Sequence, residues 1–161
     1  MQTFLPYPDF LACARSLDPL RLGKQRVEAL QVLRGLTVAG HGWRRHPAVK
    51  MWSGYEEALV AYGLTICRVW IAGGRADTVA GTLANDLAES CAIHRVREQP
   101  DLVAAGEVPP WLGREDFHLS HRSALVRKKP DFYRPLFGDL PELPYIWPES
   151  DRPPSCPGVS G

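Results

Sequence analysis

The sequence predicts an all-α protein, built as a compact single-domain helical bundle with an extended N-terminus and a proline-rich C-terminal arm. Apolar residues recur at helical spacing along most of residues 10–129, and no segment alternates apolar and polar residues as a half-buried strand does. A length of 161 residues also suits one domain. We expect the helical domain to cover residues 1–147 and residues 148–161 to form a disordered tail, because proline, serine and glycine are frequent there.

The N-terminal part predicts an extended segment followed by two helices. Two prolines keep residues 1–8 extended, because proline disfavours helix in the residue before it. Asp9 then caps a short helix that reaches about Leu17. The pair Asp18-Pro19 starts a second helix, which runs to about Gly35, because an N-cap acid precedes a proline at the first helical position.

Three further helices are expected after a glycine-containing loop. A long apolar stripe predicts one helix over residues 47–70, with its aromatic residues in the core rather than on a base-stacking surface. A weaker pattern covers residues 78–97, and residues 99–113 form a loop. A last helix over residues 114–129 stops at Pro130. In the arm beyond it, Tyr145 and Trp147 are expected to pack onto the bundle.

The four cysteines, Cys13, Cys67, Cys91 and Cys156, are widely separated and form no C-x-x-C pair. A chain of this length builds its own core, so we expect free thiols in a reducing compartment rather than a disulfide framework. No apolar run approaches the ~20 residues that a membrane helix needs, and the N-terminus lacks the pattern of a secretory signal. We therefore expect a cytoplasmic protein with no membrane partner.

The formal net charge of +1 hides an uneven distribution along the chain. Residues 15–50 carry a balance of +6 and residues 114–134 a balance of +3, whereas residues 51–113 carry −4 and the residues after Arg134 carry −3. If the two basic segments meet in the fold, they form a positive face that attracts a polyanion. The alternative is that both are merely solvated helix faces.

The histidines do not form a recognisable metal motif. His118 and His121 are three residues apart, whereas H-E-x-x-H needs a spacing of four and a central glutamate. We therefore expect no metal ion, and we assign His121 to a phosphate or base contact. No glycine-rich phosphate loop and no nucleophile elbow occurs, so no nucleotide or other cofactor is expected. A hydrolase or metal enzyme that uses His46, His118 and His121 stays open as an alternative.

Four segments carry a resemblance to a known family: MQTFLPYPDFL at the start, LGKQRVEALQVLRG over residues 22–35, GWRRHP over residues 42–47 and SHRSALVRKKPDFY over residues 120–133. With them, the chain resembles the pyrimidine-dimer DNA glycosylase superfamily of the phage endonuclease V type, and more closely a bacterial branch of it. The resemblance implies a helical bundle through which the N-terminus reaches DNA. It also implies an α-amine that attacks the sugar C1′ to form an imine, assisted by a helix glutamate.

The helix departs from the family at the position of this glutamate. Aligned without gaps, the family's Arg-Glu pair falls on Lys24-Gln25, and glutamine cannot act as the carboxylate. Glu28 lies one turn further along the same face, which Arg21 and Gln31 also share. Either Glu28 or Asp18 at the helix start is therefore a substitute carboxylate.

The second departure is Gln2, because a bulky second residue normally leaves the initiator methionine in place. The amine would then belong to Met1. Lys24 is an alternative amine, provided that burial lowers its basicity. Activated water, held by Glu28 or Asp18, is the third alternative.

The resemblance implies double- or single-stranded DNA as the partner. We assign DNA contacts to a set of basic and aromatic residues: Arg21, Arg26, Trp43, Arg45, His46, His121, Arg122, Arg127 and Lys128. Trp43 or Trp111 would wedge the duplex open. The sequence thus predicts a DNA repair glycosylase, with lyase activity when an imine forms, that lies at the bacterial nucleoid when bound to DNA. The alternative is a non-catalytic nucleic-acid-binding protein derived from such an enzyme.

Overall fold

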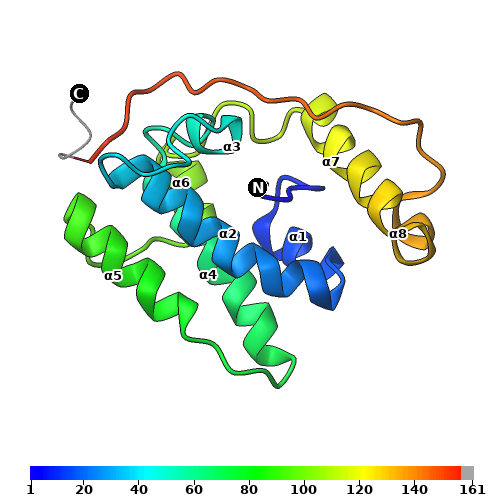
Figure 1. Ribbon diagram of the computed structural model, residues 1–161, viewed down its shortest axis with the longest axis horizontal. Helices are drawn as coiled ribbons and strands as arrows, with labels where there is room; N and C mark the ends of the chain where they lie inside the picture. The colour runs from blue at the N-terminus through cyan, green and yellow to red at the C-terminus, as the bar shows by residue number, and fades with distance from the viewer. Residues whose placement is uncertain (157–161) are drawn as a thin grey trace.

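The computed structural model describes residues 1–156, and within these residues every regular element is a helix (Figure 1). Eight helices are formed there: α1 (Phe10–Ser16), α2 (Pro19–Thr37), α3 (Pro47–Lys50), α4 (Glu56–Ala72), α5 (Val79–Cys91), α6 (Gln99–Ala104), α7 (Glu115–Lys128) and α8 (Pro130–Phe137). The all-α prediction is therefore confirmed for this part of the chain. None of these helices is long and apolar enough to cross a membrane.

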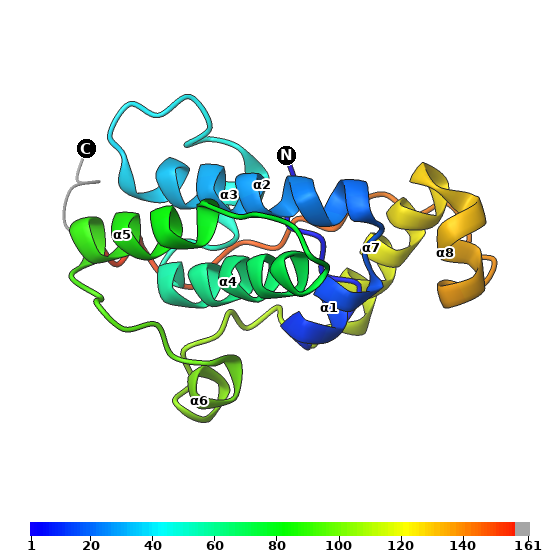
Figure 2. The same cartoon turned by 90° about the horizontal axis from the view of Figure 1, so that it is seen from below.

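The core lies where α2, α4 and α5 pack against one another, with α1 against α4 (Figure 2). Gly63 of α4 permits the close approach. A Cβ atom at this position would lie 2.8 Å from Leu83 Cδ1 of α5 and 3.1 Å from the Ala29 Cβ of α2. Three aromatic residues of the stripe that was predicted to be core are buried, as expected: Trp52, Tyr55 and Tyr62 are each less than 5% exposed. Trp70, at the end of the stripe, is only half-buried and lines a surface hollow.

The single helix predicted over residues 47–70 is instead two helices, α3 and α4, separated by a turn. Gly54 lies in the turn with φ +79°, a left-handed conformation that favours glycine. A Cβ atom at Gly54 would overlap the Cβ atom of Arg152, which comes from the C-terminal arm. Glu56 Oε1 accepts hydrogen bonds from the Gly54 and Ser155 backbone nitrogens at 3.1 and 3.2 Å. The break therefore depends on a distant segment, which apolar spacing alone does not reveal.

Three other parts of the chain differ from the expected helices. The helix predicted over residues 78–97 ends at Cys91, where Ala92 adopts a left-handed φ of 56°. The short helix α6 lies inside the expected loop, with Pro100 in its first turn. Pro130 ends α7, as predicted, but an unexpected further helix, α8, starts there, because proline fits the first turn of a helix.

The N-terminal segment runs through the interior, as predicted, and Figure 1 shows it entering the middle of the molecule beside α2. Thr3 and Leu5 have no exposed surface. The indole nitrogen of Trp52 donates a hydrogen bond to Thr3 Oγ1 at 3.0 Å. Burial of an extended segment requires partners for its backbone polar groups, and side chains from three helices provide them.

The C-terminal arm follows α7 and α3 towards the end of α5 (Figure 1). Ser123 Oγ donates to the Pro141 carbonyl at 2.7 Å and accepts from the Leu143 nitrogen at 3.0 Å. Further along, Tyr55 Oη donates to Asp151 at 2.6 Å. The arm therefore stays attached to the bundle past residue 147, where the disordered tail was expected to begin. Residues 157–161 of that expected tail lie outside the described residues.

A disulfide joins Cys91, the last residue of α5, to Cys156 in the arm. This corrects the expectation of four free thiols, because the arm returns to α5 across a sequence separation of 65 residues. Cys13 and Cys67 are free and buried. Burial raises the pKa of Cys67 to about 12, so this thiol is not a nucleophile at neutral pH.

Candidate active site

Glu28 is the carboxylate of α2 that contacts the N-terminal segment. Its Oε2 atom accepts a hydrogen bond from the backbone nitrogen of Gln2 at 2.8 Å. The side-chain nitrogen of Gln25 donates a longer hydrogen bond, at 3.3 Å, to the same oxygen. Glu28 is half-buried, and both donors bind Oε2, so Oε1 is not used by either of them. The carboxylate is thus fixed on one side and accessible on the other.

Gln25, by contrast, is only 1% exposed and acts within the protein. Its Oε1 atom accepts from the Phe4 nitrogen at 2.8 Å and from the Tyr62 hydroxyl at 2.7 Å. Its Nε2 atom donates to the Gln2 carbonyl at 2.9 Å. Gln25 therefore binds the N-terminal backbone and is shielded from any ligand.

His46 lies close to the N-terminus and to Glu28. Burial lowers the pKa of His46, the positive amine of Met1 lowers it further, and the carboxylate of Glu28 opposes these effects. His46 Nδ1 accepts from the Ala48 nitrogen at 3.0 Å at the start of α3. Met1 and Glu28 thus both lie within electrostatic range of His46, although the three predicted residues come from separate segments.

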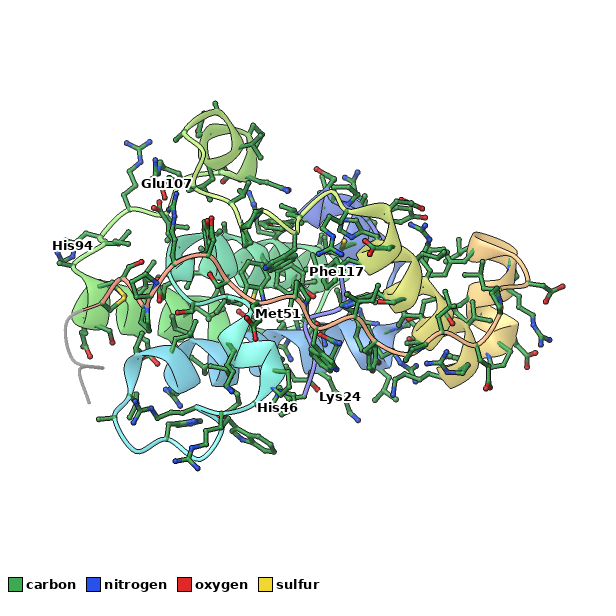
Figure 3. All side chains as sticks on the ribbon, turned by 90° about the horizontal axis from the view of Figure 1, so that it is seen from above. Lys24, His46, Met51, His94, Glu107 and Phe117 are labelled. Carbon is green, nitrogen blue, oxygen red and sulfur yellow. A yellow bond between two sulfur atoms is a disulfide. The ribbon has the colours of Figure 1, made fainter. Side chains whose placement is uncertain are left out.

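Lys24 and Glu28 border the same hollow of about 550 Å³, whose other walls are largely apolar: Pro19, Leu20, Gly23, Val27 and Trp70. Lys24 is exposed and forms no ion pair in the described part of the chain. Figure 3 shows Lys24 and His46 on the same side of the molecule. The predicted alternative amine therefore borders the same hollow as the carboxylate, and its side chain is exposed.

His118 and His121 of α7 form hydrogen bonds with the backbone of the N-terminal segment at Leu5. The Leu5 nitrogen donates to His121 Nδ1 at 3.0 Å, and His118 Nδ1 lies 2.8 Å from the Leu5 carbonyl. His121 has no exposed surface, and burial lowers its pKa to about 3. The prediction that His121 contacts DNA is therefore corrected: it is a neutral, interior hydrogen-bonding residue.

Asp18 does not belong to this site. It has no exposed surface, and it forms a hydrogen bond with the Tyr133 hydroxyl and an ion pair with Arg21 at 3.0 Å. Burial alone would raise the pKa of Asp18, but the Tyr133 and Arg21 contacts together lower it. Lys129 Nζ lies 3.7 Å away. Asp18 is therefore a structural anion that joins α2 to α8, and its candidacy as the catalytic carboxylate is corrected.

Three of the predicted DNA-binding arginines are also committed within the protein. Arg21 pairs with Asp18, Arg26 with Asp77, and Arg122 with Glu115. Arg26 additionally lies over the ring of Trp70, 4.2 Å from its centroid. Arg122 Nη1 donates to the Pro6 carbonyl at 2.8 Å and so supports the N-terminal segment. These guanidinium groups are mostly buried, and their contacts stabilise the fold.

The other predicted DNA contacts are more exposed. Trp43 is 48% exposed, and Arg45, Arg127 and Lys128 are exposed as well. Arg45 borders a polar hollow of about 510 Å³ with Gly40, His41, Gly42 and Arg44. Arg127 also donates to the Leu143 carbonyl at 3.0 Å.

Trp111, the second proposed wedge, is 2% exposed and donates its indole N–H to the Met51 carbonyl at 2.9 Å. A side chain in this position cannot enter a duplex without unfolding its surroundings. The wedge assignment to Trp111 is therefore corrected, and Trp43 is left as the exposed tryptophan of the pair.

Two features that the sequence reasoning passed over complete the site. Tyr62 was assigned to the core by its spacing, and nothing in the pattern signals that its hydroxyl contacts Phe4 and Gln25. Trp147 was expected only to pack the arm onto the bundle. Its ring lies 5.8 Å from that of His46, whose ring is 5.7 Å from that of Trp43. His46, which lies within electrostatic range of the Met1 amine, is therefore the middle ring in a row of three aromatic rings.

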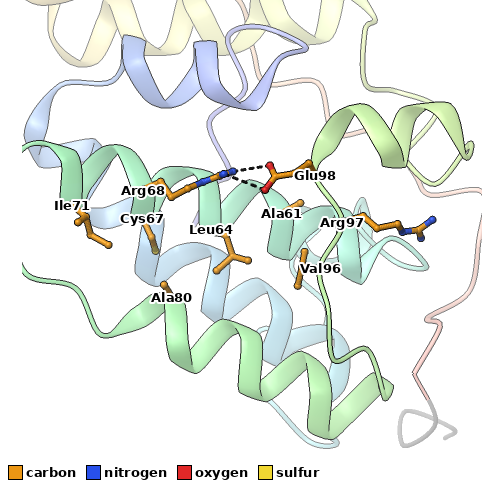
Figure 4. A pocket seen from close by; sticks show the side chains of 9 residues that line it. All are labelled: Ala61, Leu64, Cys67, Arg68, Ile71, Ala80, Val96, Arg97 and Glu98. Carbon is orange, nitrogen blue, oxygen red and sulfur yellow. Dashed lines mark hydrogen bonds and ion pairs between the residues drawn. The ribbon is translucent and has the colours of Figure 1, made fainter.

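The remaining hollows do not involve this site. An apolar hollow of about 230 Å³ lies along α4, where the ion pair between Arg68 and Glu98 crosses its rim (Figure 4). None of the predicted catalytic or DNA-binding residues lines it. Among residues 1–156, no group of three or more His, Cys, Asp or Glu side chains is arranged to hold a metal ion.

Comparison with known proteins gives one match. Residues 1–79 match the family model described as pyrimidine dimer DNA glycosylase. No curated protein and no solved structure matches the chain. The matched segment contains the N-terminus, Gln25, Glu28, His46 and Tyr62, and so it covers the helix face and the loop described above.

Proposed function

We propose, from the match of residues 1–79 to the pyrimidine dimer DNA glycosylases, that this chain is a DNA glycosylase that excises a damaged or modified base. The single observation that supports this most is the contact between Glu28 Oε2 and the Gln2 nitrogen at 2.8 Å. It joins an accessible carboxylate to the start of the chain. This pairing is the one that amine-dependent excision of a base requires.

The reaction that fits this arrangement begins at the amine of Met1. The amine nitrogen, in its neutral form, bonds to the sugar C1′ while the N-glycosidic bond breaks and the base leaves with the bonding electrons and takes up a proton. Glu28 stabilises the positive charge that develops on the sugar. The amine nitrogen then gives up a proton and the sugar ring oxygen takes one up, so that the ring opens and an imine forms. Loss of the C2′ proton to solvent expels the 3′ phosphate, which is the lyase step.

Two variants of the mechanism use the same carboxylate. The amine of Lys24 borders the hollow that Glu28 also borders, so it is a second candidate nucleophile. A water molecule activated by Glu28 would give base excision without an imine and without strand cleavage. Borohydride separates these variants, because it traps an imine covalently and leaves a water-dependent reaction unaffected.

The DNA would lie across the face that carries the open end of the N-terminal segment. Arg45, Arg127 and Lys128 are the exposed cations for its phosphates, and the aromatic row of Trp43, His46 and Trp147 is available to stack on an exposed base. A DNA substrate would place the working protein in the cytoplasm at the nucleoid.

The test is a glycosylase screen with the purified protein. Duplex and single-stranded oligonucleotides carry a cyclobutane pyrimidine dimer, uracil, an alkylated base, an oxidised base or an abasic site, with borohydride in half of the reactions. We expect release of at least one base, and a loss of about 100-fold or more in Glu28→Gln. Glu89→Gln, an exposed carboxylate on α5, is the matched control and should keep full activity.

Two results would change the proposal. Full base release by Glu28→Gln would remove this carboxylate from the mechanism. Salt-sensitive DNA binding without base release from any substrate would favour the alternative, a non-catalytic nucleic-acid-binding protein in which Gln25 marks lost catalysis.

A further inference from the structure

We infer that Gln25, together with Tyr62, is a positioning residue that sets the carboxylate of Glu28 and the N-terminal backbone in one fixed arrangement. The inference rests on the proposed glycosylase function for its kinetic consequences. Its structural part stands on the hydrogen bonds alone. Under it, the amide at position 25 is a working part of the site rather than the trace of a lost glutamate.

The hydrogen-bonding capacity of the Gln25 amide is completely used. A primary amide offers two donor hydrogens and two acceptor lone pairs. The donors go to the Gln2 carbonyl at 2.9 Å and to Glu28 Oε2 at 3.3 Å. The acceptor receives the Phe4 nitrogen at 2.8 Å and the Tyr62 hydroxyl at 2.7 Å. All four contacts lie in or next to the interior, where each unmade bond would be costly.

The orientation of the amide is fixed by partners that have no choice of role. A backbone N–H, here that of Phe4, always donates, and a backbone carbonyl, here that of Gln2, always accepts. The oxygen of Gln25 must therefore face Phe4 and its nitrogen must face Gln2. This orientation then places the second N–H towards Glu28, so Glu28 Oε2 accepts its hydrogen bond from Gln25.

Tyr62 locks the opposite side of the amide. Its hydroxyl has one hydrogen to donate, which Gln25 Oε1 at 2.7 Å and the Phe4 carbonyl at 2.9 Å share, and its ring has no exposed surface. Burial raises the pKa of Tyr62 well above its ordinary value, so the hydroxyl keeps its proton. Tyr62 thus ties α4 to the same backbone that Gln25 ties to α2.

A glutamate at position 25 would break this arrangement. An ionised carboxylate only accepts hydrogen bonds, so the Gln2 carbonyl and Glu28 would both lose their donor. Two carboxylates at the 3.3 Å separation of this contact would also repel each other, and one of them would stay protonated to higher pH. Glutamine at position 25 and glutamate at position 28 are therefore a matched pair.

The decisive variant is Gln25→Glu, studied in the full chain with Gln31→Glu as the control. Gln31 is half-buried on α2, three residues beyond Glu28. Gln31→Glu therefore adds the same charge as Gln25→Glu, but without the direct contact with Glu28. We expect Gln25→Glu to move the acid limb of the pH–rate profile upward by about one pH unit and to lower kcat about tenfold at neutral pH. Affinity for abasic DNA and the Gln31→Glu profile should change little. Equal shifts of the acid limb in Gln25→Glu and Gln31→Glu would show that direct contact with Glu28 does not cause the shift, and would overturn the inference.

A second variant and a measurement without substrate test the positioning role independently of the proposed glycosylase activity. Tyr62→Phe keeps the amide, so it should lower kcat without moving the acid limb. Unchanged kcat would remove Tyr62 from the positioning role. Carbon-13 NMR titration of the Glu28 carboxyl group should show an upward shift of its midpoint in Gln25→Glu, and slow exchange of the Gln25 amide protons in the wild type. An unmoved midpoint or rapid exchange overturns the inference, whereas absence of base release overturns only the proposed function.

Discussion

The carboxylate of Glu28 accepts a hydrogen bond from the backbone nitrogen of Gln2 at 2.8 Å, across 26 residues of sequence. This contact fixes the second residue of the chain, so the position of Met1 is restricted to the space beside Glu28 and His46. A nucleophile that is held in this way gains from proximity, because little freedom is lost when the substrate arrives. Because Met1 is restricted in this way, a chemical group added to its amine should reduce the reaction with the sugar.

We therefore predict that acetylation of the Met1 amine abolishes borohydride trapping on abasic DNA. The acetylated nitrogen cannot form an imine, while the carboxylate and the basic residues stay in place. Trapping efficiency and DNA affinity, measured on acetylated and untreated protein, check this, with the thermal midpoint as a control for folding. Undiminished trapping would show that Met1 is not the nucleophile and would favour Lys24, which a Lys24→Met variant tests directly.

The helices themselves could be predicted because their signals are local. Asp9 caps α1 and Pro19 starts α2, and both act within one turn of the residues that they order. The break between α3 and α4 could not be predicted, since Arg152 and Pro153 make Gly54 necessary from about a hundred residues away. The disulfide was hidden for the same reason, because Cys91 and Cys156 become neighbours only after the arm has folded back.

The sequence predicts which residues share a helix face, but it does not predict which of them the fold encloses. Glu28 was selected from its spacing on α2, and it is half-buried beside the N-terminal segment. Asp18 and His121 have equally suitable functional groups, but the fold encloses both and uses them as hydrogen-bonding residues. Residue type identifies which chemistry is available, and burial determines whether a ligand can reach it.

The disulfide between Cys91 and Cys156 closes a loop of 65 residues, so its removal should destabilise the fold. We expect Cys156→Ser to lower the free energy of unfolding by about 4 kcal/mol, the value that the chain-entropy relation gives for a loop of this length. Urea unfolding followed by tryptophan fluorescence measures it. Reductant should weaken the wild type to the same extent and leave Cys156→Ser unchanged. Equal stabilities of the oxidised wild type and the variant would contradict this.

The contact between Asp18 and Tyr133 should make stability depend on pH. The lowered pKa of Asp18 means that the folded state favours the carboxylate, so its contribution is complete above the ordinary range of about 4 and disappears as the pH falls through the lowered value. We expect Tyr133→Phe to cost about 1.5–3 kcal/mol at neutral pH and clearly less in strong acid.

Urea unfolding of the wild type and of Tyr133→Phe at both ends of the pH range checks this prediction. Tyr7→Phe is the matched control, since the Tyr7 hydroxyl forms no hydrogen bond in the described part of the chain. A cost for Tyr133→Phe that is equal at both pH values would show that the charge of Asp18 does not matter to the contact.

Some of the predicted DNA-binding cations are bound to partners within the protein and others are exposed. Variants of the two groups should therefore have different effects on DNA binding and on stability. Arg45 and Lys128 are exposed and form no ion pair within residues 1–156, so Arg45→Ala and Lys128→Ala should weaken DNA binding without changing the thermal midpoint. Each phosphate contact that is lost should reduce the slope of log affinity against log salt by about one.

Arg122→Ala should behave in the opposite way, because Arg122 binds the Pro6 carbonyl and pairs with Glu115. We expect it to lose about 1.5–3 kcal/mol of stability and, below its melting temperature, to keep the wild-type salt slope. Fluorescence anisotropy across a salt series and thermal unfolding separate the two classes. A reduced salt slope in Arg122→Ala would mean that the guanidinium leaves its internal partners when DNA binds, and it would return this residue to the DNA-binding surface.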